Sequence, residues 1–67
     1  MLFYDSNTDS HYTPKEKGWY VQYKTESGDA GAIKVPRKPW NADDALAMLN
    51  EINPEEIWYV QFYSEVK

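Results

Sequence analysis

The chain alternates large apolar and polar residues in two places, with nearly the same letters. Residues 19–24 read WYVQYK and residues 58–63 read WYVQFY. Successive side chains of a strand point to opposite faces of a sheet, so each copy divides into an inner and an outer set. We interpret the repeat as one inside–outside pattern used in two strands. The inner set is expected to comprise Trp19, Val21, Tyr23, Trp58, Val60 and Phe62.

Turn residues and prolines between the two copies mark the other elements. The stretch ESGDAG at residues 26–31 has turn chemistry, and residues 32–35 alternate again before Pro36, which predicts a β-hairpin. Asn41 is placed to cap a helix whose apolar residues recur on one face, and Asn53 with Pro54 ends it. Residues 57–66 are predicted to form the last strand.

These elements predict an α+β fold. Their order is ββαβ, and we expect a three-stranded antiparallel sheet in the order 2-1-3 with the helix packed on one face. With 67 residues, the chain is expected to be a single small domain over residues 1–67. Within it, residues 18–66 form the ββαβ core, and residues 1–17 are an N-terminal segment that is mostly loop.

Composition and charge narrow the classes of function. The chain has no cysteine, which excludes disulfides and thiolate metal sites and fits a reducing cytoplasm. It has no basic leader and no stretch of eighteen apolar residues, so we expect a cytoplasmic protein that makes no membrane contact. Seven Lys and Arg against eleven Asp and Glu give a formal charge of −4, which disfavours nucleic acid as a partner.

A single helix covers a single face, so the outer face of the predicted sheet has no cover within the ββαβ core. We identify this face as the leading candidate for partner binding. Two other interpretations remain open: tyrosines suit any exposed sheet, or Leu2, Phe3 and Tyr4 fold back over the face. The candidate residues on this face are Tyr20, Gln22, Lys24, Lys34, Tyr59, Gln61 and Tyr63.

The residues that catalysis requires are missing. His11 lies in a polar stretch with no nucleophile or acid at a defined spacing, and it is expected to be solvated. The pair Asp43 and Asp44 falls in the first helical turn, where it favours the helix dipole. No nucleotide-binding or zinc-protease motif is present. We therefore predict a protein that is not an enzyme, with no catalytic residue and no cofactor.

One stretch matches most ligand positions of a calcium loop. Asp5, Asn7 and Asp9 alternate, and Glu16 occupies the twelfth position, as in an EF-hand. Ser10 stands where the sharp turn of that loop needs glycine, and there is no room for the flanking helices. We expect a polar loop rich in Asx turns and no metal.

Two kinds of partner fit the outer face. Its aromatic residues with Lys24 and Lys34 could stack single-stranded RNA, although the acidic helix side would repel a longer polyanion. A protein partner, or a second copy of the chain, suits a tyrosine-rich surface of mixed polarity better. Asp43 and Asp44 are included as a second, acidic contact surface that could imitate nucleic acid.

The order of elements also resembles a family of phage proteins. A hairpin ended by Val35-Pro36, an acidic helix start at Asp43-Asp44-Ala45-Leu46 and one last strand are similar in pattern to the T7-type inhibitors of bacterial RNA polymerase. The likeness spans residues 18–66. It implies a small phage or mobile-element inhibitor that binds a host protein or protein complex in a bacterial cytoplasm. That family has several arginines near its contact surface, whereas this stretch has only Arg37, so the target is not carried over.

Overall fold

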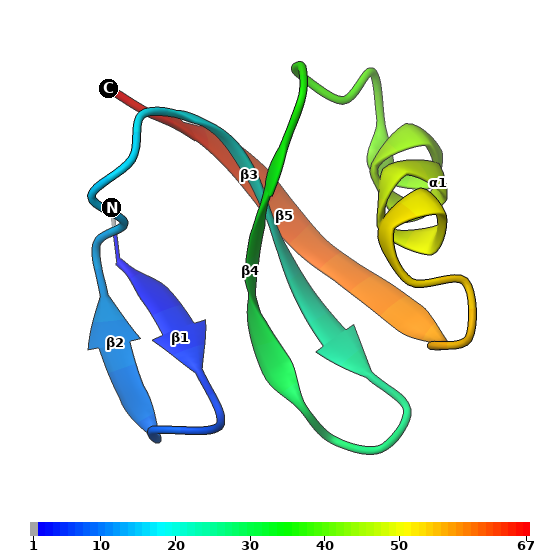
Figure 1. Cartoon of the computed structure of the whole chain (residues 1–67), viewed down its shortest axis with the longest axis horizontal. Helices are drawn as coiled ribbons and strands as arrows, with labels where there is room; N and C mark the ends of the chain where they lie inside the picture. The colour runs from blue at the N-terminus through cyan, green and yellow to red at the C-terminus, as the bar shows by residue number, and fades with distance from the viewer. Residues whose placement is uncertain (1) are drawn as a thin grey trace.

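The computed structural model of the chain describes residues 2–67 and has an α+β architecture with one helix and five strands among them (Figure 1). In chain order the elements are β1 (Phe3–Asp5), β2 (Ser10–Tyr12), β3 (Gly18–Thr25), β4 (Ala30–Val35), α1 (Ala42–Ile52) and β5 (Trp58–Val66).

The long strands form the three-stranded sheet that the sequence predicts. Their order is β4-β3-β5, and β3 pairs antiparallel with both neighbours. A tight turn joins β3 to β4, in which Gly28 has a φ of 98°, a conformation that residues with a side chain rarely adopt. The expectation of a hairpin, a helix and a final strand returning to the far side of β3 is therefore confirmed.

The N-terminal segment differs in part from the prediction. Most of residues 2–17 lie in turns and loops, as expected, but β1 and β2 pair antiparallel in a second sheet that was not predicted, with Phe3 opposite Tyr12 and Asp5 opposite Ser10. Asp9, with a φ of 48°, helps to close the turn between the two strands. The described fold thus has two sheets and not one. Strands of three residues are too short to produce a visible alternation of apolar and polar positions.

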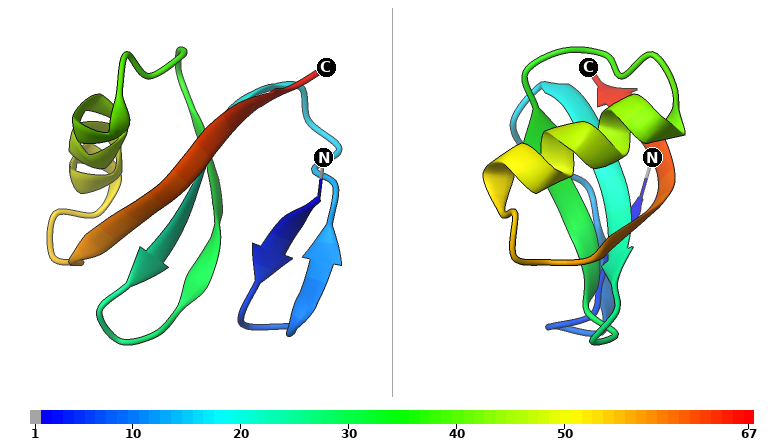
Figure 2. Two further views of the ribbon diagram at one scale, coloured as in Figure 1. Left: turned by 180° about the vertical axis from the view of Figure 1, so that it is seen from behind. Right: turned by 90° about the vertical axis from the view of Figure 1, so that its right-hand side faces the viewer.

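The elements lie in three layers (Figure 2). The helix α1 covers one face of the three-stranded sheet, which we call the helix side, and it packs mainly against β5. The β1–β2 hairpin lies over the opposite face, which we call the hairpin side, with β1 next to β4. The outer face, which was predicted to be uncovered, is therefore covered by the β1–β2 hairpin.

Local chemistry fixes both ends of α1. The side chain of Asn41 accepts a hydrogen bond from the Asp44 backbone N–H at 2.8 Å, which satisfies one of the free donors at the helix start. Asn53 donates its backbone N–H to the Leu49 carbonyl at 3.0 Å, and Pro54 follows.

Across residues 2–67, no helix has the length and apolar character of a membrane span.

A β-bulge in β5 sets which side chains face the helix. Gln22 lies opposite Phe62, but the next residue of β3, Tyr23, lies opposite Val60. Gln61 is therefore an extra residue in β5 with no partner in β3. One extra residue reverses the alternation for the remainder of the strand.

The bulge overturns the predicted positions of two aromatic residues. Phe62, expected in the core beside the helix, lies on the hairpin side, where its ring stacks 6.0 Å from that of Phe3. Tyr63, expected on the outer face, packs against the helix-side core with its ring 6.5 Å from that of Trp19. The helix-side core of buried residues comprises Val21, Val35, Ala45, Met48, Leu49 and Trp58.

These positions predict unequal costs for two core substitutions. Leu49→Ala should lower the free energy of unfolding by about 2–5 kcal/mol, because Leu49 is fully buried beneath the helix. Phe62→Ala should cost roughly half of the ~3–5 kcal/mol typical of a fully buried phenylalanine, because Phe62 is 38% exposed. Urea denaturation measures both values. A larger loss for Phe62→Ala than for Leu49→Ala would contradict the bulge.

Candidate functional site

The hairpin closes much of the face that was predicted to be open. Phe3 has no exposed surface, and its ring lies 5.6 Å from that of Tyr20 and 6.0 Å from that of Phe62. Tyr20 is buried, and its hydroxyl donates a hydrogen bond to the Glu16 carbonyl at 2.8 Å. The prediction that Tyr20 is an exposed contact residue is therefore wrong for this closed arrangement. The alternative of an N-terminal segment folding back describes it better.

Internal contacts engage three of the polar residues predicted for this face. Gln22 is only 8% exposed, and its Nε2 donates to Oε1 of Gln61 at 3.2 Å. Gln61 itself is exposed at the bulge. Lys34 is exposed at the other edge of the sheet, and its ammonium group forms a 2.8 Å ion pair with Glu16. Burial removes Gln22 from the accessible surface, and the ion pair neutralises Lys34.

Only part of the predicted face stays accessible. Lys24 and Tyr59 lie opposite each other on β3 and β5 and are exposed, and Phe62 is partly so. Tyr63 is on the helix side and is half-buried. The structure thus brings together Lys24, Tyr59 and Gln61 at the β5 edge, and it separates them from Tyr63.

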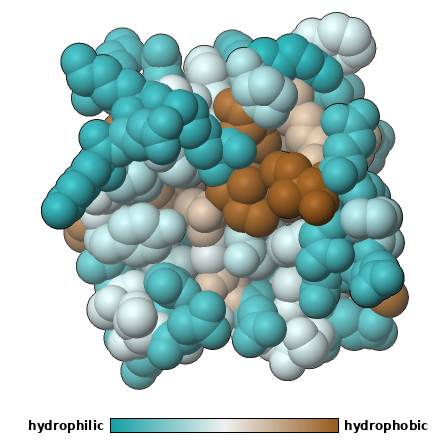
Figure 3. Space-filling view, viewed as in Figure 1, coloured by the Kyte–Doolittle hydropathy of each residue, from teal (hydrophilic) through white to brown (hydrophobic). Residues whose placement is uncertain are grey.

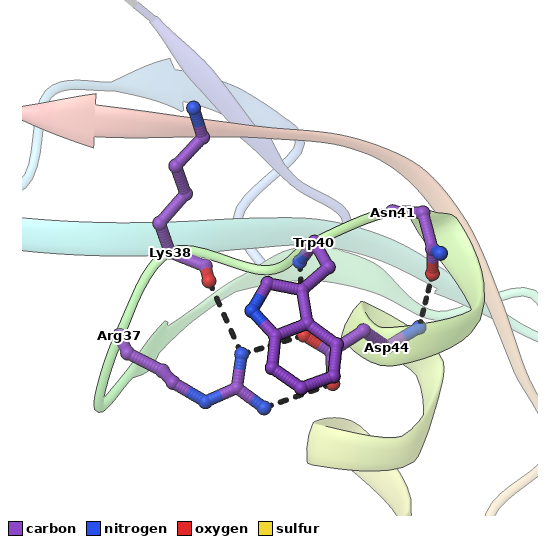
Figure 4. A network of polar contacts seen from close by, with 5 residues as sticks. All are labelled: Arg37, Lys38, Trp40, Asn41 and Asp44. Atoms are coloured by element: carbon purple, nitrogen blue, oxygen red, sulfur yellow. Dashed lines mark hydrogen bonds and ion pairs between the residues drawn. The ribbon is translucent and has the colours of Figure 1, made fainter.

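The acidic pair at the start of α1 also divides. Asp43 is exposed. Asp44 accepts two hydrogen bonds from the Arg37 guanidinium, at 2.6 and 2.9 Å, and a third from the Trp40 backbone N–H at 2.9 Å (Figure 4). Its charge is therefore neutralised within the chain, and Asp44 organises the loop before the helix.

This loop displays a tryptophan in solvent. Trp40 is 81% exposed, the largest exposed fraction among the large hydrophobic side chains of residues 2–67. The Arg37 guanidinium carbon lies 4.9 Å from the centre of its ring, close enough for a cation–π contact (Figure 4). We call this group the Trp40 loop; it comprises Arg37, Lys38, Trp40, Asn41 and Asp44.

The Trp40 loop is anchored on both sides. Pro39, next to Trp40, is fully buried. The Lys38 ammonium group lies 5.4 Å from the centre of the Trp19 ring, and the Lys38 carbonyl accepts a hydrogen bond from Arg37 at 3.2 Å. Together with the Asp44 hydrogen bonds, these contacts restrict the backbone that carries the exposed indole.

Hydrogen bonds within the loop shift the pKa values of two of its charged residues. Hydrogen bonds from Arg37 first, and from the Trp40 backbone N–H second, lower the pKa of Asp44 from 3.8 to about 2. The same hydrogen bond raises the pKa of Arg37 above its ordinary value. Both groups are therefore charged at neutral pH.

Neither Trp40 nor Arg37 is among the site residues predicted from the sequence. A usable signal was present, since Trp40 stands outside every predicted strand and helix, between Pro39 and the helix cap Asn41. A large aromatic residue in a linker has no strand position that would bury it.

Other possible sites have less support. The carboxylates of the calcium-like stretch serve the local fold: Asp5 accepts from the Asn7 backbone N–H at 3.0 Å, and Asp9 accepts from the Tyr4 hydroxyl at 2.6 Å. Among residues 2–67, no three acidic or histidine side chains are grouped as metal ligands, and no pocket opens to the surface.

Figure 3 shows apolar side chains gathered near the centre of one face, toward α1, in a mostly hydrophilic surface.

Comparisons with protein-family models, with curated proteins and with solved structures find no match to this chain. The function of the chain is therefore inferred from the geometry of the surface that its own residues form.

The Arg37–Asp44 pair predicts a pH dependence of stability. The pKa of the Asp44 carboxyl is about 2 in the folded chain and near 3.8 when unfolded, so folding favours the charged form. This contribution is complete above about pH 5 and is lost as the pH falls toward 2 and below. The melting temperature of Asp44→Asn should therefore lie below that of the unmodified chain at neutral pH, and the gap should narrow between about pH 5 and 2. Asp43→Asn is the matched control, and a gap for Asp44→Asn that stays constant would contradict the pairing.

Proposed function

We propose that the chain is a non-enzymatic protein-binding module and that the Trp40 loop is its main contact surface. The observation that carries this proposal is an indole ring left 81% exposed on a backbone that Pro39, Asp44 and Arg37 hold in place. Leaving so large an apolar side chain in water gives up the free energy that its burial would contribute to folding. Burial against a partner would recover that free energy.

The physical properties of the loop suit binding to a protein. Tryptophan, tyrosine and arginine are the residue types most enriched among side chains that dominate binding energy, and here a tryptophan and an arginine form a cation–π contact. A restricted loop loses little conformational freedom when it binds, so more of its contact energy appears as affinity. The Trp40 loop combines both features.

Charge favours a protein partner over nucleic acid. Residues 41–57 include five carboxylates and no lysine or arginine, and within residues 2–67 Asp44 is the one of these five that forms an ion pair. A phosphate backbone would be repelled by this side of the molecule. We propose that Asp43 and the acidic helix side form a secondary contact with a basic protein surface. If the partner binds nucleic acid, these carboxylates would imitate the negative charge of its nucleic-acid ligand.

The resemblance of residues 18–66 to phage inhibitors supports a narrower proposal. On this view, the partner is a host protein or complex in a bacterial cytoplasm, and the chain blocks it by occupying a surface. In this proposal the β5 edge with Lys24, Tyr59 and Gln61 is not part of the contact. Self-association is the alternative, in which the partner is another copy of the chain.

The proposal predicts that one exposed aromatic residue matters for binding and another does not. A partner captured from bacterial lysate, identified by mass spectrometry and then purified, provides the ligand for titration calorimetry. Trp40→Ala should weaken its binding by about 2 kcal/mol, or roughly 30-fold, while the melting temperature changes little because the side chain is exposed.

Tyr59→Ala is the matched control, since Tyr59 is also an exposed aromatic residue but lies on β5. It should bind the partner within about threefold of the unmodified chain. Equal binding by the unmodified chain and Trp40→Ala would overturn the assignment of the surface. Sedimentation of the chain alone tests self-association, which Trp40→Ala should abolish if the partner is a second copy.

A further inference from the structure

The β1–β2 hairpin and the remainder of the chain have separate apolar clusters. All six residues of the helix-side core come from β3, β4, α1 and β5. Phe3 is buried in a different cluster, where it packs against Tyr12 within the hairpin and against Tyr20 and Phe62 of the sheet. Removing the hairpin from the sheet would therefore leave the helix-side core intact.

Hydrogen bonds to β4 and the ring of Phe3 attach the hairpin to the sheet. Ser6 donates its backbone N–H to the Ala30 carbonyl at 2.9 Å, and the Ala30 N–H donates to the Ser6 hydroxyl at 2.6 Å. These contacts lie at one end of β4, and Phe3 is the fully buried apolar residue that the hairpin contributes. A two-stranded hairpin with three-residue strands is marginally stable in water by itself.

The closed hairpin leaves two polar atoms of the sheet unsatisfied. Oε1 of Gln22 and Oγ of Ser64 are buried, and no described residue forms a hydrogen bond with either. Their residues belong to the face that the hairpin covers, since the partner of Gln22 is Phe62 and the partner of Ser64 is the buried Tyr20. Burying such groups without a partner opposes closure of the hairpin. The hairpin is thus an imperfect match to the surface beneath it.

We propose that the hairpin is an autoinhibitory cover that opens as a unit and uncovers a second binding face. The occupant that this face fits is an extended protein segment that brings an aromatic side chain in place of Phe3 and a hydrogen-bond donor for Gln22 Oε1. The two hydrogen bonds between Ser6 and Ala30, one to the Ala30 carbonyl and one to the Ser6 hydroxyl, show how such a segment is held at the sheet. This surface lies on a different face of the sheet from α1 and does not depend on the Trp40 loop.

Opening can be measured by thiol labelling, because the chain has no cysteine of its own. Ser64→Cys introduces a near-isosteric thiol beneath the hairpin, and Val21→Cys introduces one in the helix-side core. In native buffer, the thiol of Ser64→Cys should react with a disulfide reagent on the order of 100-fold faster than that of Val21→Cys. Adding Phe3→Ala should speed the first reaction at least about tenfold and leave the second nearly unchanged.

Equal labelling rates for Ser64→Cys and Val21→Cys would overturn the proposal, since both thiols would then be reached only by unfolding of the whole chain. The same conclusion follows if Phe3→Ala accelerates both reactions to the same extent, because the hairpin would then be part of one cooperative fold.

The occupant is tested with a synthetic peptide of residues 2–12 as the probe, added to the full-length Phe3→Ala chain. The peptide should bind this variant at least about tenfold more tightly than it binds the unmodified chain, whose own Phe3 competes for the same site. A peptide with alanine at position 3 should bind about tenfold more weakly. Peptide binding that is unaffected by alanine at position 3 would show that an aromatic side chain is not what the face recognises.

Discussion

The bulge at Gln61 is the feature on which the arrangement of the aromatic side chains depends. Without the extra residue, Phe62 would continue the inner set begun by Trp58 and Val60 and would face the helix. With it, Phe62 turns to the hairpin side and meets Phe3, while Tyr63 takes the place beside Trp19. The inserted Gln61 therefore turns Phe62 toward the hairpin and allows Tyr63 to pack against the helix-side core.

The two candidate surfaces follow from different parts of this arrangement. The hairpin side became a covered face because Phe62 offers Phe3 an apolar partner there. The Trp40 loop depends instead on the entry to α1, where Asp44 serves the helix start and the loop at once. The Asp44 carboxylate accepts the Trp40 backbone N–H, and the Asp44 backbone N–H donates to Asn41, so the helix start and the position of the exposed indole are linked through one residue.

Patterns that repeat over several residues made much of the fold predictable. The alternation in β3 and the helical periodicity up to Ile52 are long enough to identify each element, and Asn41 marks the helix start. The bulge was not predictable, because an inserted glutamine leaves the alternation looking regular. The hairpin was missed because its strands are too short for a pattern. Trp40 was not predicted because it lies in a linker with no alternating pattern, whereas the predicted strand tyrosines include Tyr20, which is buried, and Tyr63, which faces the helix side.

The placement of Phe62 and Tyr63 on opposite faces is the central claim, and nuclear Overhauser effects between aromatic ring protons test it most directly in the unmodified chain. We expect a cross-peak between the rings of Phe3 and Phe62, whose centres are 6.0 Å apart. We expect a second cross-peak between the rings of Trp19 and Tyr63, whose centres are 6.5 Å apart. Cross-peaks from the Phe62 ring to Leu49, with none to Phe3, would contradict the bulge and the covered face together.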